Sequence, residues 1–340
     1  MRTLVSCLGL ALGSLLFHAE SRAQDTALVV GTASPAGVYH LAGRALCRLS
    51  TQPCRAEASA GSQANLEAIR RGELEFAFAQ SDLHYYAVQG QAAFQAAGPD
   101  PELRSLVSLH SEPFTLVVRR DAGIRGLDDL PGRAVNIGNP GSGQRGTMQR
   151  LMAMQAWHNG DFRLINDLPA EQQSLELCHG NIDAMVYTVG HPNASVAQAI
   201  RLCDAALVDV QGEAVERLIA DYPFFSPAWI AGGLYGSDQP AVRTFGVRAT
   251  LVASASADPE RVYRLVADLF DNLTRFKAFH PAFGTLTPRG MIHDGLSAPL
   301  HEGALRYYRE RGWIEDEEDA AGAPTAEEFS APGGDRGSSD

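Results

Sequence analysis

The stretch GTASPAG, residues 31–37, follows an apolar run and precedes a segment with helical periodicity. Three later stretches have the same order of strand, short polar turn and helix: 60–65 (AGSQAN), 80–82 (QSD) and 138–144 (GNPGSGQ). Such a turn leaves the first N–H groups of the helix without intrahelical partners, at the positive end of the helix dipole. It can hold an anion without a lysine or a metal. Four such turns predict two lobes that grip one small anion.

Apolar runs of strand length alternate with helical segments along most of the chain. This alternation is typical of an α/β protein with a parallel sheet covered on both faces. Residues 103–109 and 115–118 are expected to form separate strands, with a crossover at Glu112-Pro113 between them. The other expected strands are 27–31, 55–59, 76–79, 134–138, 182–189, 206–210 and 245–254, and the expected helices are 37–49, 62–71, 82–88, 143–157, 194–202, 213–220, 259–279 and 302–311.

The composition of the 340-residue chain limits its partners. Hydrophobic residues make up 45% and charged residues 20%, an ordinary globular balance, and the length suggests about two domains. The net charge of -12 disfavours nucleic acid or an anionic membrane surface as a partner. Lys277 is the only lysine among the 28 basic residues and lies in a helical segment away from the four turns, which disfavours lysine-based covalent chemistry.

The two ends of the chain differ from the rest. Arg2 supplies a positive start, residues 4–17 form an apolar stretch too short to span a membrane, and cleavage of this export signal is expected near Ala23. We therefore expect a periplasmic protein. Residues 316–340 are rich in Glu, Asp, Gly, Ala, Pro and Ser, and we expect a disordered acidic tail.

Four cysteines remain after the signal, an even number that favours disulfides in an exported chain. Three pairings are possible, and proximity favours Cys47–Cys54 in one lobe and Cys178–Cys203 in the other. Buried free thiols are the alternative. Neither C-x-x-C nor H-E-x-x-H occurs, which disfavours a zinc site.

Templates for catalysis and nucleotide binding are poorly matched. No serine lies in G-x-S-x-G, no G-x-x-x-x-G-K-[ST] occurs, and no strand–turn–helix carries G-x-G-x-x-G with an acidic residue downstream. We therefore expect neither an enzyme nor a cofactor. Glu112 and Asp183 are isolated carboxylates, with no sequence reason to share a site. Arg145 follows the fourth turn, where it either pairs with a ligand carboxylate or faces solvent.

Polar residues at the turns supply the candidate ligand site. A serine there most often caps its own helix, but the recurrence favours a shared site, because doubly wound folds bind ligands beyond the carboxyl ends of their strands. Asn65 and Asp82 are candidates to orient a polar ligand, although Asp82 equally suits a helix N-terminus. Tyr39, Tyr187 and Tyr235 adjoin glycine turns, where they either reach the cleft or pack in the core.

The chain resembles the TAXI family of solute-binding proteins, the extracytoplasmic receptors of one class of TRAP transporters. The resemblance covers almost all of the mature chain in the family order. The matching stretches are 31–41 (GTASPAGVYHL), 59–66 (SAGSQANL), 72–82 (GELEFAFAQSD), 126–132 (GLDDLPG), 136–143 (NIGNPGSG), 182–195 (IDAMVYTVGHPNAS), 232–235 (GGLY), 245–254 and 299–308 (PLHEGALRYY).

This resemblance implies a type II periplasmic-binding-protein fold of two α/β lobes joined by crossing hinge strands. The implied lobes are 24–112 plus 248–315 and 113–247, after a signal peptide at 1–23. Pro35, Ala36 and Gln144 depart from the family pattern. The implied ligand contacts are Ser34, Gly37, Tyr39, Ser62, Gln80, Ser81, Gly141, Ser142, Gly143 and His191.

The resemblance also implies a function. Family members capture small acidic solutes such as glutamate or 2-oxoglutarate and deliver them to the membrane subunit of the transporter. We expect a monomer that closes on its ligand. Two alternatives stay open: a sensory protein that contacts a membrane kinase, and an exported hydrolase on the same fold that uses His191 with Ser142.

Overall fold

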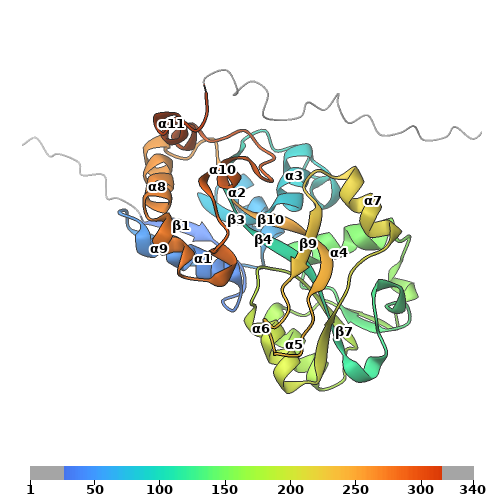
Figure 1. Ribbon diagram of the computed structural model, residues 1–340. Coiled ribbons are helices and arrows are strands. Elements are labelled where there is room, and N and C mark those ends of the chain that lie inside the picture. The colour runs from blue at the N-terminus through green and yellow to red at the C-terminus, as the bar shows by residue number, and fades with distance from the viewer. Residues whose placement is uncertain (1–26, 316–340) are drawn as a thin grey trace, which may run out of the picture.

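The computed structural model describes residues 27–315, which form two α/β lobes joined by crossing strands (Figure 1). The expected signal peptide and acidic tail lie outside these residues. A ten-stranded sheet runs through both lobes in the order β2-β1-β3-β10-β4-β7-β5-β6, with β8 beside β4 and β9 beside β10. Within the described range, no helix is long and apolar enough to cross a membrane.

In the first lobe, parallel strands alternate with helices as the sequence predicts. Each of the first three strands leads through a turn into a helix, so these helices begin at one edge of the sheet. The last four helices of the described chain complete this lobe. Its elements are β1 (Leu28–Gly31), α1 (Val38–Leu49), β2 (Cys54–Glu57), α2 (Ser62–Arg70), β3 (Phe76–Gln80), α3 (Ser81–Gln89), α8 (Pro259–Asp271), α9 (Leu273–Lys277), α10 (Pro288–His293) and α11 (Glu302–Glu310).

The second lobe repeats this organisation around three parallel strands, β5, β6 and β7. Its elements are β5 (Ala134–Asn136), α4 (Gly143–Met154), β6 (Leu164–Asn166), α5 (Ala170–Cys178), β7 (Ala184–Thr188), α6 (Ala194–Leu202), β8 (Ala205–Val208), α7 (Glu213–Asp221) and β9 (Ser226–Ile230). Short 3₁₀ helices cover Ala92–Phe94, Arg120–Ala122, Leu127–Asp129, Asn159–Asp161 and Pro281–Phe283.

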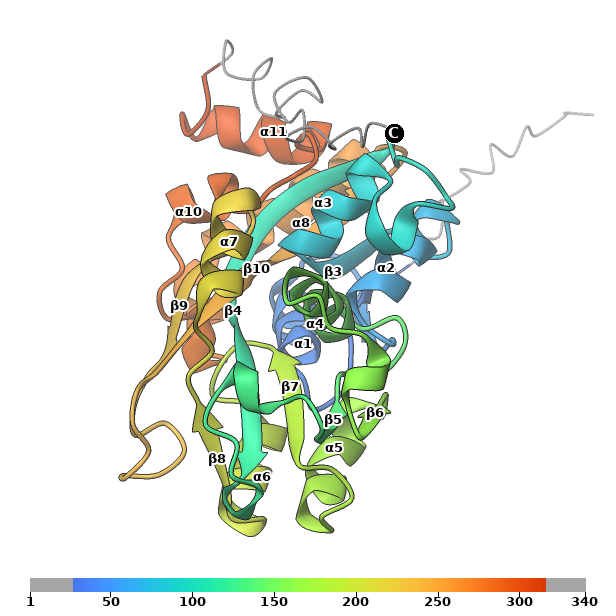
Figure 2. The same cartoon turned by 90° about the vertical axis from the view of Figure 1, so that its right-hand side faces the viewer.

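Two long antiparallel strands, β4 (Leu103–Arg119) and β10 (Val242–Ser254), carry the chain between the lobes. Figure 2 shows β4 running the length of the molecule, with α3 near its upper end, β7 at its lower end and α4 between the lobes. Gly246 faces Pro113 at the crossing, and a Cβ there would lie 2.9 Å from the carbonyl oxygen of Glu112. Glycine therefore permits the two strands to pass this closely.

The structure corrects the expectation of two strands before and after residue 112. The strand β4 is continuous through Pro113, because at that point it leaves its pairing with β10 and begins to pair with β7 and β8. A proline has no N–H to donate to a neighbouring strand. The point at which a strand changes its pairing partner therefore tolerates a proline. The expected helix over 259–279 ends at Asp271 and restarts at Leu273, on either side of Asn272.

The sequence analysis missed four elements: β6, α5, β9 and α10. Helix α5 matters most, because it begins at the interlobe cavity described below. Both expected disulfides are confirmed. Cys47 on α1 bonds to Cys54 on β2, and Cys178 at the end of α5 bonds to Cys203 after α6, so each bridge lies within one lobe.

Candidate functional site

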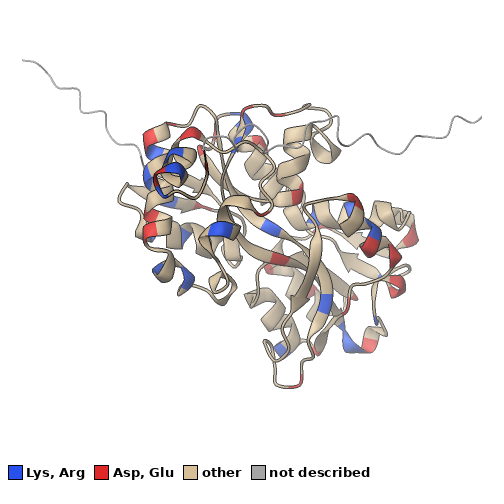
Figure 3. Cartoon of the chain, turned by 45° about the horizontal axis from the view of Figure 1, so that its top comes forward, with Lys and Arg blue, Asp and Glu red and all other residues tan. Residues whose placement is uncertain are grey.

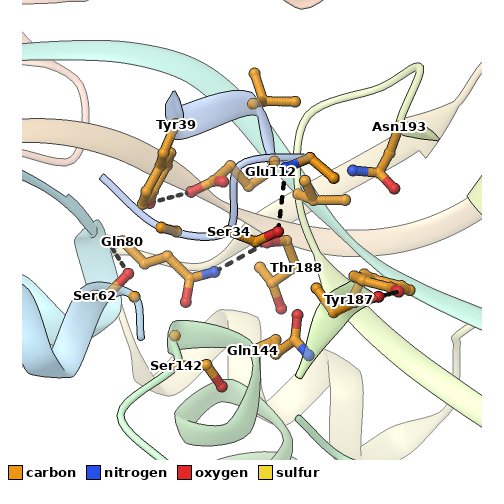
Figure 4. Close-up of a pocket in the computed structure, with 18 of the residues that line it drawn as sticks. Ser34, Tyr39, Ser62, Gln80, Glu112, Ser142, Gln144, Tyr187, Thr188 and Asn193 are labelled. Carbon is orange, nitrogen blue, oxygen red and sulfur yellow. Dashed lines mark hydrogen bonds between the residues drawn. The ribbon is translucent and has the colours of Figure 1, made fainter. Parts of the chain in front are cut away.

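A cavity of about 80 Å³ lies where the two lobes meet (Figure 4). A water molecule needs roughly 10–15 Å³ of such space, so the cavity suits a molecule of few non-hydrogen atoms. It is lined by Ala33, Ser34, Ala36, Gly37, Val38, Tyr39, Ala60, Gly61, Ser62, Gln80 and Glu112 from the first lobe and the crossing, and by Asn139, Ser142, Gly143, Gln144, Ala170, Tyr187, Thr188, Val189, Asn193 and Ser195 from the second lobe.

Six helices begin at this cavity. Gly37, Gly61 and Gln80 precede α1, α2 and α3 in the first lobe. In the second lobe Ser142 caps α4, Ala170 is the first residue of α5, and Asn193 caps α6. The caps of α4 and α6 already accept N–H groups of their own first turns. Each helix still brings the positive end of its dipole to the cavity, so the cavity favours negative charge.

The lobes approach so closely that a Cβ at the start of α4 would have to displace side chains of the first lobe. A Cβ on Gly143 would overlap Oε1 of Gln80 and lie 2.7 Å from Oγ of Ser62. Gly61, at φ +124°, lies opposite, and a Cβ there would be 3.0 Å from Cα of Ser142. These glycines therefore allow helix starts from opposite lobes to meet at the cavity.

Three buried polar atoms in the cavity wall have no hydrogen-bond partner. They are Oε1 of Gln80, whose residue is 2% exposed, Oγ1 of Thr188, whose residue is 7% exposed, and Nε2 of Gln144, a donor. The Gln80 backbone N–H donates to Ser62, and its Nε2 lies 3.5 Å from the Thr188 carbonyl oxygen. Buried polar atoms are nearly always paired in native proteins, so a cavity with unpaired ones is suited to a polar ligand.

Glu112 brings a carboxyl group into the same cavity from the crossing strand β4. Its Oε2 accepts a 2.7 Å hydrogen bond from the Tyr39 hydroxyl, and its Oε1 lies 3.8 Å from Nε2 of His110, beyond hydrogen-bond distance. Burial raises the pKa of Glu112 well above its usual range, and burial lowers the pKa of His110 to about 3. No lysine, arginine or histidine belongs to the cavity lining in the described part of the chain.

Direct contacts between the lobes surround the cavity. The Ala64 N–H donates to the carbonyl oxygen of Gly141 at 3.2 Å. Behind these turns, the Thr147 hydroxyl of α4 donates at 2.7 Å to the fully buried Asp82 of α3. Nearby, the Arg150 guanidinium lies 5.0 Å from the centre of the Tyr86 ring. The structure is therefore that of a closed pair of lobes.

The structure gathers eight of the twelve predicted ligand-binding residues around the cavity. Ser34 donates to Glu171 at the exposed mouth, Tyr39 donates to Glu112, and Tyr187 donates to the carbonyl oxygen of Ala170. The eight residues are Ser34, Gly37, Tyr39, Ser62, Gln80, Ser142, Gly143 and Tyr187.

The other four predicted residues lie outside the cavity lining and have structural partners. Ser81 accepts a hydrogen bond from the Arg248 backbone N–H. The carbonyl oxygen of Gly141 accepts the interlobe bond from Ala64. His191 is bonded to Thr115 and to Tyr235, and burial lowers its pKa to about 4. Tyr235 also accepts from the Asn193 backbone N–H, which holds the start of α6 in place.

The pair proposed for a hydrolase is not assembled. The Ser142 hydroxyl donates to the carbonyl oxygen of Asn139, and both ring nitrogens of His191 are engaged with other residues. Arg145 turns toward Gly138 and Asp167 of its own lobe. Asn65 donates to the backbone of Thr32 and Phe78. Among the described residues no group of three or more His, Cys, Asp or Glu is placed to hold a metal ion.

The sequence analysis missed several lining residues, chiefly Glu112, Thr188 and Asn193. Asn193 carried a usable signal, since an Asn directly before a helical run is a preferred N-cap. Thr188 ends the strand β7, so it belongs to the carboxyl ends where such folds bind ligands. The only local signal at Glu112 was the proline that follows it. Asp183, the other isolated carboxylate, pairs with Arg163 away from the cavity.

Solved structures share this fold at low sequence identity. MatC from Rhodopseudomonas palustris with bound malate has a TM-score of 0.52 and 17% identity, over 77% of this chain and 90% of that one. PhnD1 from Prochlorococcus marinus in complex with methylphosphonate has a TM-score of 0.50 and 11% identity, over 85% of this chain and 99% of that one. The model of the NMT1-like family matches residues 30–312. The chain therefore belongs to the NMT1-like family, whose members are periplasmic solute-binding proteins.

Proposed function

We propose that this protein is the periplasmic receptor of a TAXI-type TRAP transporter and that it captures a small carboxylate between its lobes. The observation that carries the proposal is the convergence of six helix N-termini on one small cavity. A helix N-terminus stabilises an anion by about 0.3–1 kcal/mol at an exposed site, and by more where water is excluded. Several termini together can replace a basic side chain.

The charge distribution supports this interpretation. Basic and acidic residues are interspersed over both lobes (Figure 3), whereas the cavity has no basic side chain in its described lining. Main-chain N–H groups at the cavity act directly on a ligand that contacts them, whereas salt screens the charges of distant surface residues. The net charge of -12 therefore does not oppose a small anionic ligand.

Closure couples binding to the shape of the molecule. The N-termini of α1, α2 and α3 come from the first lobe, and those of α4, α5 and α6 come from the second. One ligand reaches both sets only when the lobes meet, so binding shifts the protein toward the closed form. In the proposed cycle the closed receptor docks on the membrane subunit, and the ligand is handed over without any chemical change.

A panel of organic acids and amino acids tests the binding step. Differential scanning fluorimetry and calorimetry of the mature protein would include L-glutamate, L-aspartate, 2-oxoglutarate, glutarate, succinate and malate. A ligand present at a hundred times its Kd stabilises the folded state by about 2.7 kcal/mol, which raises Tm by several degrees. A panel in which no carboxylate stabilises the protein would contradict the proposal.

The variant T188V sharpens the test. Oγ1 of Thr188 has no partner in the protein, so its replacement by a methyl group of similar size removes no internal hydrogen bond. We expect unchanged or slightly higher Tm without ligand, and weaker binding of the carboxylate that binds the wild type. Uptake by a TRAP-type membrane subunit in proteoliposomes, with and without the receptor, tests the transport partner separately.

A further inference from the structure

We infer that Glu112 binds a protonated amino group of the ligand, so that the solute is an amino acid rather than a simple organic acid. This inference rests on the proposed function and names its ligand class. It follows from two opposite preferences within the cavity. The helix N-termini favour a negatively charged ligand group, and the Glu112 carboxyl group favours a positively charged one.

Glu112 lies beside the first turn of α1 and across the cavity from the start of α4. Figure 4 shows Glu112 and Tyr39 on one side of the cavity, and Ser142 and Gln144 of the α4 N-terminus on the opposite side. Gln80 and Thr188 lie between them, with their unpaired Oε1 and Oγ1 atoms. A molecule with a carboxylate at one end and an ammonium group at the other satisfies both sides.

The hydrogen bonding of Glu112 leaves one oxygen available. Oε2 accepts from Tyr39, while Oε1 accepts no hydrogen bond from the described residues. An ionised carboxylate has acceptor capacity at both oxygens, and an ammonium group offers three donors. A ligand amine at Oε1 therefore completes a site of which Tyr39 already forms one half.

The groups that face Glu112 do not neutralise its charge. Tyr39 of α1 is a neutral donor, His110 of β4 is buried in its neutral form, and Asp82 of α3 adds negative potential. Arg248 of β10 is directed to Asp294 and Ser108 instead. A buried carboxylate without a cationic partner is costly, so burial in the empty protein favours the protonated form of Glu112. A ligand ammonium group supplies the missing partner.

Proton release is the measurable consequence. When an ammonium ion binds, Glu112 ionises and its proton leaves the protein. The bound state then carries fewer protons than the free state, so affinity for an amino acid rises with pH until Glu112 is ionised in the free protein as well. A ligand that lacks the amine accepts a hydrogen bond from protonated Glu112. Its affinity therefore falls as rising pH removes that proton.

Two matched ligand pairs test the inference: L-glutamate against glutarate, and L-aspartate against succinate. Each pair differs only by the α-amino group. We expect the amino acid of at least one pair to bind the wild type about tenfold to a hundredfold more tightly, as for a hydrogen bond between charged groups. Its calorimetric enthalpy should depend on the ionisation enthalpy of the buffer, which reports the released proton.

The variant E112Q tests the residue itself. Its amide oxygen still accepts from Tyr39, so the change removes a charge and preserves the shape. We expect E112Q to lose most of the advantage of the amino acid and to keep its affinity for the deaminated partner. The control E171Q removes the carboxylate that accepts from Ser34 at the mouth, and it should keep the wild-type preference.

The outcomes separate this inference from the proposed function. If the wild type binds deaminated acids as tightly as amino acids and releases no proton, the role of Glu112 is overturned while carboxylate capture stands. If E171Q loses the preference and E112Q keeps it, Glu112 is also overturned. Binding of 2-oxoglutarate or malate, with no binding of either pair, overturns this inference alone, whereas binding of no acid in the whole panel overturns both proposals. Should E112Q fail to fold, the ligand pairs and the proton release of the wild type still decide the question.

Discussion

The Tyr39 hydroxyl of α1 donates a 2.7 Å hydrogen bond to Oε2 of Glu112 on β4, a residue 73 positions further along the chain. Both side chains are buried, and both line the interlobe cavity. The bond ties helix α1 to the strand that crosses between the lobes. One contact thus serves both the stability of the first lobe and the orientation of the only ionisable carboxyl group in the described cavity lining.

We predict that Y39F lowers the free energy of unfolding by about 1–3 kcal/mol, because a buried acceptor loses its donor. Urea denaturation monitored by circular dichroism provides the measurement. The matched control is Y263F, whose hydroxyl donates to Glu310 at the surface. That variant should stay within about 0.5 kcal/mol of the wild type. Equal effects of the two changes would show that the buried bond adds no stability.

We predict that G143A folds but binds the identified ligand at least about tenfold more weakly. The added methyl group overlaps Oε1 of Gln80 in the closed form. Either the lobes stay apart or the Gln80 carboxamide turns into the cavity, and both outcomes weaken binding. Calorimetry measures the affinity, and Tm without ligand reports folding.

The control for this substitution is G160A. Gly160 lies in a 3₁₀ helix of the second lobe, with open space where a Cβ would stand. It should bind like the wild type. Wild-type affinity in G143A would show that the cavity accepts a wider separation of Gly143 and Gln80.

We predict that D82N is more stable than the wild type at pH 7 and equally stable near pH 4. Burial raises the pKa of Asp82 to about 6. The folded state therefore binds this proton more tightly than the unfolded state, and the associated stability is present below the unfolded pKa and lost as pH rises through about 6. The shift corresponds to a difference on the order of 2–3 kcal/mol.

Chemical denaturation of both proteins between pH 4 and 7 measures this difference. D183N is a control for which the opposite change in stability is expected. Burial opposes the ionisation of Asp183, but the Ala134 N–H and the Arg163 guanidinium outweigh it and lower the pKa of that carboxyl. D183N should therefore lose stability relative to the wild type at pH 7. A constant difference between D82N and the wild type across the range would contradict the role of Asp82.

Local sequence signals predicted much of the fold. The turns at Gly37, Gly61 and Ser142 combine a strand end, a small residue and a helix start, and each of these properties depends on near neighbours in the sequence. The disulfide pairings were equally local, because each bridge joins successive elements of one lobe. Helix α5 escaped notice because its N-cap is Pro169, which lacks the side-chain oxygen of a typical cap.

The composition of the cavity depends on contacts distant in sequence. The contact of Glu112 with Tyr39 depends on the place of β4 beside β10 in the sheet. The strand β10 begins 130 residues later than Glu112 in the chain. His191 and Tyr235 adjoin turns as expected, yet they bond to each other, and Tyr235 also accepts from the Asn193 N–H at the start of α6. Nothing in a local pattern distinguishes a turn residue that faces a ligand from one that supports the turn.

The crossing of β4 and β10 has a mechanical consequence. Within residues 27–315 these two strands are the covalent links between the lobes, and they pass each other at Pro113 and Gly246. Any rotation that opens the molecule must bend both strands there, so atoms near this pivot travel least. Glu112 is next to this pivot in the chain, whereas the start of α4 lies in the second lobe, which would move relative to the first. In the proposed capture mechanism, Glu112 would therefore keep nearly the same position in the open and closed forms, while the start of α4 would move toward it on closure.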